Sequence, residues 1–346
     1  MARNRSLIPR RFRTRALVGL TASALAAAGL FAFGAAQANA GASASPEAGP
    51  RVGASKVPAH AVTGYWQNFN NGAKVQTLAD VQKDYDIVAV AFADATTSPG
   101  QVDFKLDPAL NYSEDQFKAD IAAKHAEGKS VVISVGGEKG AVSVSDDASA
   151  DAFAKSITGL MDKYGFDGVD IDLENGLNST YMTKALESIH AAKSDVVVTM
   201  APQTIDMQSP QNEYFKTALN IKSFLTVVNM QYYNSGSMNG CDGKTYSAGT
   251  VDFLTSLACV QIKGGLDPSQ VGIGTPASSR AAGSGYVEPG VVNDALDCLA
   301  KGERCGSFTP DQKWPGIRGA MTWSTNWDAT DSDKWSSTVG PHVHGL

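Results

Sequence analysis

Eight short apolar runs, separated by helix-like segments, follow one another along most of this chain. Several of the runs are almost continuously apolar, which is typical of parallel strands covered on both faces. Three of the intervening segments, residues 114–127, 148–164 and 180–192, carry apolar residues at helical spacing, and residues 178–180 are cap-forming. The pattern predicts an α/β protein whose single folded domain is a (β/α)8 TIM barrel. The predicted strands are residues 62–67, 87–93, 131–137, 168–174, 196–202, 225–233, 271–276 and 319–323.

The main alternative to a barrel is an open, doubly wound sheet. Such a sheet normally carries a glycine-rich phosphate loop after its first strand. Here the first strand reads Gly64-Tyr65-Trp66-Gln67, without a G-x-G-x-x-G pattern. In a barrel, functional side chains gather where the strands end at their carboxyl side. The candidates for a site therefore stand at the ends of the predicted strands.

The first forty residues differ in character from the rest. The first 15 residues include six arginines and no acidic residue. An apolar run over residues 16–36 follows, and the segment ends in Ala38-Asn39-Ala40. Small residues at positions 38 and 40 are typical of signal-peptidase cleavage, so residues 1–40 are predicted to be a signal peptide. A membrane anchor is the alternative, because the apolar run is nearly long enough to span a bilayer. General secretory and twin-arginine export both remain open.

Residues 41–57 are rich in Ala, Ser, Gly and Pro and are predicted to form a flexible leader. This leaves residues 58–346 for the barrel. Without the six arginines, 23 basic residues face 35 acidic ones, a formal charge of −12. A nucleic-acid-binding protein would have the opposite sign, and no further apolar stretch is long enough to cross a membrane. We therefore expect a neutral partner.

The chain has four cysteines, all in the part that would be exported. An even number in a secreted chain favours disulfides, and the absence of a C-x-x-C pair argues against zinc. Three pairings are possible. We expect the local one, Cys241 with Cys259 and Cys298 with Cys305.

The fourth predicted strand contains the candidate catalytic residues. Side chains alternate along a strand, so Asp170, Asp172 and Glu174 share one face and apolar residues occupy the other. The strand is predicted to be interior, and no Lys or Arg shares the acidic face, which argues against a solvated surface. Three crowded carboxylates repel one another unless some hold protons. Such a row favours acid–base chemistry over packing.

These residues and four other motifs resemble glycoside hydrolase family 18, which comprises chitinases and endo-β-N-acetylglucosaminidases. The most specific motif is Asp167-Gly-Val-Asp-Ile-Asp-Leu-Glu174, similar to that family's D-G-x-D-x-D-x-E. The resemblance spans residues 60–328. The other motifs are Ser134-Val-Gly136-Gly137, Met230-Gln231-Tyr232-Tyr233-Asn234, Met321-Thr-Trp323 and Gly64-Tyr65-Trp66-Gln67-Asn68-Phe69, the last similar to bacterial chitinases of the type-D group.

Most glycosidases place two carboxylates on opposite sides of the scissile bond, whereas these candidates all come from one strand. An N-acetylated substrate removes the need for a second one, because its own acetamide oxygen can attack the anomeric carbon. We expect Glu174 to protonate the leaving oxygen and then to activate water. Asp172 would hydrogen-bond the acetamide N–H, and Asp170 would share a proton with it. Tyr233 would donate its hydroxyl to the acetamide oxygen.

The resemblance and the positions at strand ends also indicate residues that bind the substrate. Trp323 would present a flat apolar face to a sugar ring. Tyr65 is expected to point inward, whereas the direction of Trp66 is left open. Candidate substrate-binding residues are Trp323, Tyr65, Phe92, Gln203, Asn234, Gln231 and Met200, although barrel packing is an alternative for Met200. Candidate supporting residues are Asp167, Ser134, Gly136 and Gly137.

We expect no cofactor and no metal. His342 and His344 could suggest a metal site, but they stand on a tail that we expect to be frayed, with no carboxylate or thiol partner. The segment between the last two strands, residues 277–317, is too short for the large α+β insertion of some family members. A shallow, open groove is therefore expected.

The sequence as a whole predicts a secreted, extracellular, monomeric chitinase. It would hydrolyse β-1,4 bonds in chitin or N-acetylglucosamine oligosaccharides by a substrate-assisted, retaining, endo-acting mechanism, without nucleic acid or membrane partners after signal cleavage. Two alternatives remain open at this stage. One is an endo-β-N-acetylglucosaminidase that acts on N-glycans, and the other is a non-catalytic chitin-binding lectin.

Overall fold

Eight parallel strands close into a barrel in the computed structural model, which describes residues 57–346. The strands are β1 (Ala61–Gln67), β2 (Ile87–Ala95), β4 (Ser130–Gly137), β5 (Gly168–Leu173), β6 (Val197–Met200), β7 (Val227–Gln231), β10 (Val271–Pro276) and β11 (Gly319–Trp323). They pair in chain order, and β1 pairs with both β11 and β2, which closes the ring. Every strand of the ring lies on one of the predicted runs, so the predicted (β/α)8 barrel is confirmed.

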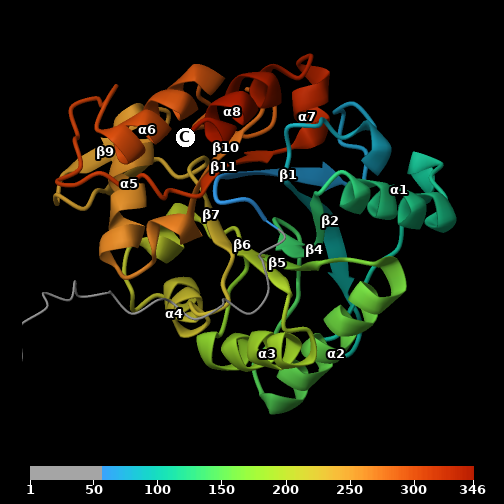
Figure 1. Cartoon of the computed structure of the whole chain (residues 1–346). Coiled ribbons are helices and arrows are strands. Elements are labelled where there is room, and N and C mark those ends of the chain that lie inside the picture. The colour runs from blue at the N-terminus through green and yellow to red at the C-terminus, as the bar shows by residue number, and fades with distance from the viewer. Residues whose placement is uncertain (1–56) are drawn as a thin grey trace, which may run out of the picture. The chain divides into compact units, whose positions relative to one another are not determined.

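The α-helices of the described residues surround the barrel (Figure 1). The three helices predicted from apolar spacing are present with nearly the predicted bounds, and Asn178 caps the third by accepting hydrogen bonds from the backbone N–H groups of Thr180 and Tyr181. The connection from β1 to β2 holds only a short 3₁₀ helix, Leu78–Asp80. The α-helices are α1 (Glu114–Ala126), α2 (Asp147–Tyr164), α3 (Ser179–Ala192), α4 (Glu213–Asn220), α5 (Val251–Lys263), α6 (Pro289–Lys301), α7 (Thr325–Thr330) and α8 (Lys334–His344).

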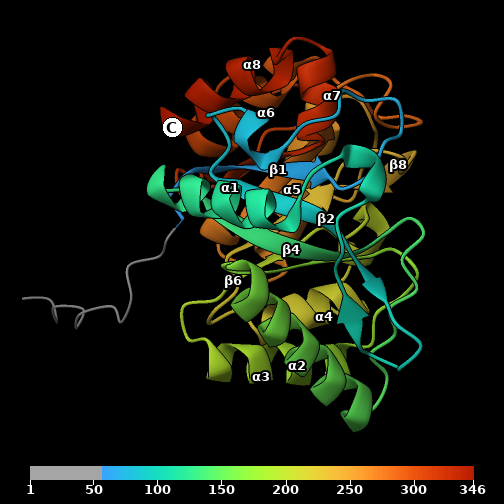
Figure 2. The ribbon, with the colours of Figure 1, turned by 90° about the vertical axis from the view of Figure 1, so that its right-hand side faces the viewer.

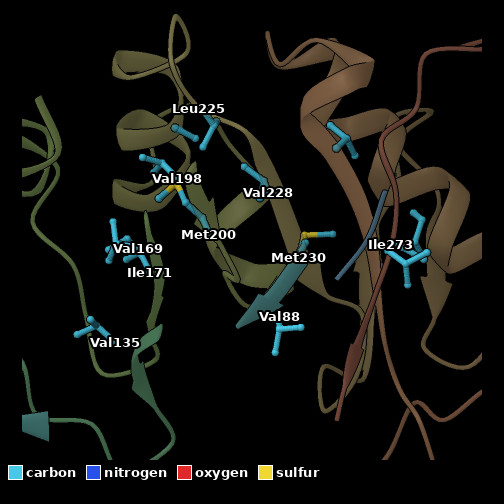
Figure 3. Close-up of a cluster of buried hydrophobic side chains, with 14 of the residues drawn as sticks. Val88, Val135, Val169, Ile171, Val198, Met200, Leu225, Val228, Met230 and Ile273 are labelled. Atoms are coloured by element: carbon cyan, nitrogen blue, oxygen red, sulfur yellow. The ribbon is translucent and has the colours of Figure 1, made fainter. Parts of the chain in front are cut away.

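Two apolar layers follow from the alternation of side chains along the strands. The inner layer fills the barrel with residues such as Ala89, Val132 and Val197. The outer layer packs the strands against the helices, and Figure 3 shows part of it, with Val198 and Met200 of β6 close to Val228 of β7. Each fully buried side chain of this size contributes about 1.5–3 kcal/mol to stability. Because the outer face of each strand packs against the helices, only the inner face can contribute side chains to a site.

Additional short strands lie at the edge of the barrel where the barrel strands end. The hairpin of β8 (Ser237–Asn239) and β9 (Thr245–Ser247) lies between β7 and α5, and β3 (Val102–Asp103) pairs antiparallel with β2. Figure 2 shows the carboxyl end of β1 directed toward the side on which β8 lies. Between β10 and β11 the structure has α6 and no strand, although these residues are all described. A large α+β insertion is thus absent from this segment, as predicted.

Two disulfides stabilise the outside of the barrel. Cys241 pairs with Cys259, with Cα atoms 5.7 Å apart, and Cys298 pairs with Cys305, with Cα atoms 4.8 Å apart. The predicted local pairing is therefore confirmed. In the chain-entropy model the longer loop contributes about 3 kcal/mol and the shorter about 2 kcal/mol.

The prediction of a frayed C-terminal tail is wrong. His342 and His344 lie in α8, and both contact carboxylates that are themselves almost fully buried. The His342 Nε2 atom is 3.1 Å from Asp297 Oδ1, and the His344 Nε2 atom is 2.8 Å from Asp86 Oδ2. These contacts hold α8 against the barrel, which a sequence pattern of two histidines does not reveal.

The signal peptide predicted for residues 1–40 lies outside the described residues, as does the predicted leader apart from Val57. Over residues 57–346, no helix is both long and apolar enough to cross a membrane.

Candidate active site

A row of carboxylates enters the barrel from β5. Asp170 and Asp172 are almost completely buried, and Glu174, one residue beyond the end of β5, is half-buried. The hydrogen-bond partners of Asp170 come from β1, β4 and β6, which places the row on the inner face of the barrel. The prediction of an interior acidic strand is thus confirmed.

Asp170 is the best supported carboxylate of the row. Its Oδ2 atom accepts hydrogen bonds from the Tyr65 hydroxyl at 2.7 Å and the Ser134 hydroxyl at 2.6 Å, and its Oδ1 atom accepts one from the Thr199 hydroxyl at 2.6 Å. Burial raises the pKa of Asp170, and the three hydroxyl donors oppose that rise. Burial and then the charge of Asp170 raise the pKa of Tyr65 well above its usual range, so this hydroxyl remains a donor.

Asp172 occupies a less favourable environment for a charge. Burial raises its pKa well above the usual range, and the charges of Asp170 and Glu174 raise it further. The only opposing hydrogen bond comes from the Gln231 Nε2 atom, 2.8 Å from Asp172 Oδ1. Three donors favour the charged form of Asp170 and one favours that of Asp172, so a proton held by this pair resides more readily on Asp172.

Two glutamine amides face the Glu174 carboxylate. Gln203 and Gln231 stand in register at the ends of β6 and β7, where they form an isolated bridge. The Gln203 Nε2 atom is 3.3 Å from Glu174 Oε2, and the Gln231 Nε2 atom is 3.1 Å from Glu174 Oε1. The structure thus brings both predicted glutamines to the acidic row. Their amide nitrogens hold the carboxylate oxygens in position.

Asp206 is a carboxylate near the row that sequence reasoning missed. It lies in the 3₁₀ helix Thr204–Met207 that follows β6, and its Oδ2 atom accepts a hydrogen bond from the Gln203 backbone N–H at 3.2 Å. Burial raises its pKa, and the charge of Glu174 adds to that rise. No strand pattern marks this position, because it lies in a short connection.

Aromatic rings form a second part of the site. Trp323, at the end of β11, lies with its ring centroid 5.6 Å from that of Tyr65 and 5.8 Å from that of Phe92, the latter at an interplanar angle of 14°. Phe69 was part of the first-strand motif but not a candidate site residue. Its ring stacks on that of Phe92, with the two centroids 6.4 Å apart. Trp66, whose direction was left open, points outward and packs with Tyr112 and Phe117. The predicted inward direction of Tyr65 is confirmed.

Tyr233 approaches the row from the segment after β7. Its side chain is only 8% exposed, and burial followed by the charges of Asp172 and Glu174 raises its pKa well above the usual range. Its hydroxyl is therefore protonated and can donate. Among the described residues no hydrogen-bond acceptor meets this hydroxyl.

The predicted supporting residues lie in β4 or immediately before β5. The Asp167 Oδ2 atom accepts a hydrogen bond from the Val131 backbone N–H at 2.8 Å and is 2.8 Å from His125 Nε2, so Asp167 joins β5 to its neighbours. Gly136, at φ +124°, faces Asp172 so closely that a Cβ would lie 2.2 Å from the Asp172 carbonyl oxygen. At Gly137 a Cβ would lie 2.7 Å from the Phe92 ring.

Met200 does not belong to the site. It is fully buried in the outer apolar layer, where Figure 3 shows it close to Val198. Alternation along β6 turns Thr199 inward instead, and Thr199 is a site residue that the sequence analysis missed. The same alternation could have identified it, because position 199 has the opposite parity to Met200 on a predicted strand.

Asn234 is placed at the edge of the site. It is exposed, and its Oδ1 atom accepts a hydrogen bond from the Ser284 backbone N–H at 3.0 Å. The predicted contact with a sugar would therefore have to compete with this bond.

A cavity of about 300 Å³ lies beside Glu174. Its lining includes the two chain neighbours of Glu174 and the loops that follow β4 and β5, and it contains no charged residue. Representative lining residues are Val142, Val144, Leu173, Asn175, Leu177 and Met182. The lining of the cavity beside the acidic row is therefore neutral. In the described part of the chain no cluster of three or more His, Cys, Asp or Glu residues is arranged to hold a metal ion.

Comparisons with known proteins agree with this geometry. A family model for the glycosyl hydrolases family 18 matches residues 61–338. Chitinase D of Niallia circulans is 35% identical over 325 residues, which cover 82% of this chain and 61% of that protein. A crystal structure from Streptomyces coelicolor, provisionally described as chitinase A, has a TM-score of 0.83 and 68% identity and covers 83% of this chain and 99% of that one.

The relatives differ from this chain in length, and the same fold also occurs in a protein described as an inhibitor. This chain spans 61% of the length of Chitinase D and likewise of Chitinase Chi52 from Paenibacillus xylanexedens. The xylanase and α-amylase inhibitor protein of Scadoxus multiflorus has the same fold, with a TM-score of 0.62 at 19% identity over 83% of this chain and 98% of that one. The fold alone therefore does not decide the activity, which depends on the side chains of the site.

Proposed function

The chain belongs to the glycosyl hydrolases of family 18, and on that premise we propose that it is a chitinase, which hydrolyses β-1,4 bonds between N-acetylglucosamine units. The observation that carries the proposal is the position of Glu174. This carboxylate is half-buried one residue beyond β5, and the Gln231 amide lies within hydrogen-bond distance of both Glu174 and Asp172. A neutral, N-acetylated sugar suits the cavity beside Glu174, whose described lining holds no charged residue.

In the proposed reaction Glu174 transfers its proton to the leaving glycosidic oxygen. As the bond from the anomeric carbon to that oxygen breaks, the acetamide oxygen of the same sugar bonds to the anomeric carbon and forms a cyclic intermediate. Glu174, now a carboxylate, takes a proton from water, which opens the ring from the original side. Two displacements at one carbon retain the anomeric configuration.

Asp172 and Tyr233 act on the acetamide. Asp172 accepts a hydrogen bond from the acetamide N–H and stabilises the positive charge that develops on the ring. The Tyr233 hydroxyl donates to the acetamide oxygen, and the lack of a protein acceptor for it leaves that donor free for the substrate. Asp170, held by three hydroxyl donors, shares one proton with Asp172 at rest and takes that proton when Asp172 is charged against the developing positive charge.

The remaining candidates bind the sugar or shape its surroundings. Trp323 provides a flat face for the ring whose bond is cut, and Phe92 and Tyr65 border that face. Gln203 and Gln231 orient Glu174 through their side-chain amides. When Glu174 is protonated, these amides can donate to the substrate.

We also propose that the protein is secreted, acts as a monomer and cuts within chains. Export is supported by the signal-peptide pattern in residues 1–40 and by two disulfides, which persist in oxidising compartments. Cutting within chains is supported by the segment between β10 and β11, which contains α6 and no strand.

Substitution of the proposed proton donor tests the proposal. Glu174→Gln keeps the shape of the side chain but removes the transferable proton, so turnover of a fluorogenic chitobioside should fall by about 10²–10⁴-fold while binding of a chitin oligosaccharide persists. Glu187→Gln, the same change at an exposed position of α3, is the control and should retain wild-type turnover.

Equal turnover by wild type and Glu174→Gln would refute the assignment of Glu174. Absence of turnover in the wild type, with binding intact, would indicate a lectin. Release of glycans from a high-mannose glycoprotein without cleavage of chitin oligosaccharides would indicate an endo-β-N-acetylglucosaminidase.

A further inference from the structure

The loop between β10 and α6 packs against the segment that carries Tyr233. The Asn234 backbone N–H donates to the Ser284 carbonyl oxygen at 3.2 Å, and the Ser284 backbone N–H donates to Asn234 Oδ1 at 3.0 Å. These two hydrogen bonds join segments that lie 50 residues apart in the sequence. We call the contact of Ser284 and Gly285 with Tyr233 and Asn234 the Tyr233 clasp.

Two residues of the Tyr233 clasp need special backbone conformations. Gly285 has φ +81°, and a Cβ on it would lie only 2.7 Å from the Tyr233 Cα atom and 3.1 Å from its Cβ atom. Only glycine permits so close an approach. Asn234 has φ +53°, a left-handed conformation that Asn tolerates better than most residues. Both residues are therefore matched to their places in the Tyr233 clasp.

The Tyr233 clasp fixes Tyr233 from its backbone. The Ser235 hydroxyl donates to the Tyr233 carbonyl oxygen at 2.8 Å, which adds a further restraint on the same residue. At the other end of the side chain, no acceptor among residues 57–346 meets the Tyr233 hydroxyl. The position of this hydroxyl therefore depends on packing of the ring and on restraint of the backbone.

We propose that Asn234 is a positioning residue, which acts through the Tyr233 clasp to place the Tyr233 hydroxyl where it meets the acetamide oxygen of the substrate. The inference rests on the proposed function, because that function gives Tyr233 its role. A reacting group displaced by about 1 Å can lower the rate on the order of 10²-fold. Loosening the Tyr233 clasp should consequently lower kcat and leave KM nearly unchanged.

Two variants of Asn234 separate the hydrogen bond from the backbone conformation. Asn234→Gly accommodates φ +53° but removes the oxygen that accepts from Ser284, whereas Asn234→Asp retains an acceptor oxygen at that place. On a fluorogenic chitobioside, Asn234→Gly should lower kcat by about tenfold or more and change KM by less than about threefold. Asn234→Asp should restore most of kcat.

Gly285→Ala changes the Tyr233 clasp in the other of its two segments, the loop between β10 and α6. The added methyl group would collide with Tyr233, so this variant should show the same loss of kcat. Gly290→Ala is the control, because a Cβ there meets no atom within 4 Å, and it should behave as wild type. Two variants on opposite segments keep the test informative if one of them folds poorly, which thermal unfolding would reveal.

A double-variant cycle distinguishes positioning from direct contact. If Asn234 acts through Tyr233, Asn234→Gly should lower kcat by less than about threefold further in a Tyr233→Phe background. If Asn234 contacts the sugar itself, the two losses should multiply or the loss should fall on KM, and either result would overturn the inference.

The wild type and Tyr233→Phe, assayed alongside, keep the two proposals apart. No turnover by the wild type would overturn the proposed function. Turnover by the wild type, impaired by Tyr233→Phe but unaffected by Asn234→Gly and Gly285→Ala, would overturn the inference about Asn234 alone.

Discussion

Asp172 is held in surroundings that oppose its charge. It is buried, it follows Asp170 on the same face, and Glu174 stands on its other side. A carboxyl group in such a place binds its proton more tightly in the folded chain than in the unfolded chain. The fold tolerates this cost at Asp172, and the proposed chemistry explains why.

Replacement of Asp172 should therefore stabilise the fold. Its pKa in the folded state lies above the ordinary value of 3.8, so the unfolded chain releases the proton first as pH rises, and the free energy of unfolding falls above that pH. Asp172→Asn removes the charge and keeps the oxygen that accepts from Gln231. Urea unfolding at pH 7 should show a gain of roughly 1–2 kcal/mol, with much reduced turnover.

The gain from Asp172→Asn should shrink as pH falls toward 3.8 and vanish below that pH, where the wild-type group is protonated in both states. Glu187→Gln, the exposed control, should stay within about 0.5 kcal/mol of wild type at every pH. A loss of stability at pH 7 in Asp172→Asn would contradict the assignment of a destabilising charge.

At this scale the sequence identifies residues that strand parity and a specific motif both mark. Glu174, Asp172 and Asp170 satisfy both, and Asp167 is found where local support was predicted. For Met200 the alternative of barrel packing is the one that the structure shows, in agreement with its parity on the strand. The exposed Asn234 was selected as a sugar contact, yet its oxygen is occupied by a loop that no short pattern predicts.

Among elements, the pairing of β4 with β5 is the one on which the site most depends. Gly136 stands opposite Asp172 in this register, and its lack of a side chain lets the two backbones approach. A methyl group at this place would be 2.2 Å from the Asp172 carbonyl oxygen, and φ +124° is unfavourable to any other residue.

Gly136→Ala should consequently lower the free energy of unfolding by about 2–4 kcal/mol and reduce turnover, because Asp172 must move. Gly159→Ala is a matched control inside α2, where a Cβ meets nothing within 4 Å. It should raise stability by about 0.5–1 kcal/mol, since alanine favours a helix interior. Wild-type stability in Gly136→Ala would show that the close approach is not required.

Elements of regular length were predictable, whereas short ones were not. The barrel strands are recognisable because apolar side chains are required on both of their faces, and α3 is recognisable from its cap and its spacing. The strands β3, β8 and β9 span only two or three residues each, too few for a periodic pattern.

For the whole molecule, the segment between β10 and β11 bears on how a polymer is attacked. No strand-built wall is inserted between β10 and β11 in the described residues, so a chain should bind at any point along its length. A time course with an N-acetylglucosamine hexamer should give dimer with tetramer and also trimer from the earliest samples. Dimers alone, released from one end from the start, would contradict cutting within chains. Glu174→Gln, in parallel, should yield none of these products.

The central claim is that the substrate supplies its own nucleophile and the protein supplies one proton donor. The most direct measurement is cleavage of defined chitin oligomers in which a single unit has lost its acetyl group. The bond on the reducing side of that unit should be cut more slowly by about 10³-fold or more, because the attacking amide oxygen is missing. Cleavage at that bond as fast as at the corresponding bond of the fully acetylated oligomer would contradict the account and point to a protein nucleophile such as Asp172 or Asp206.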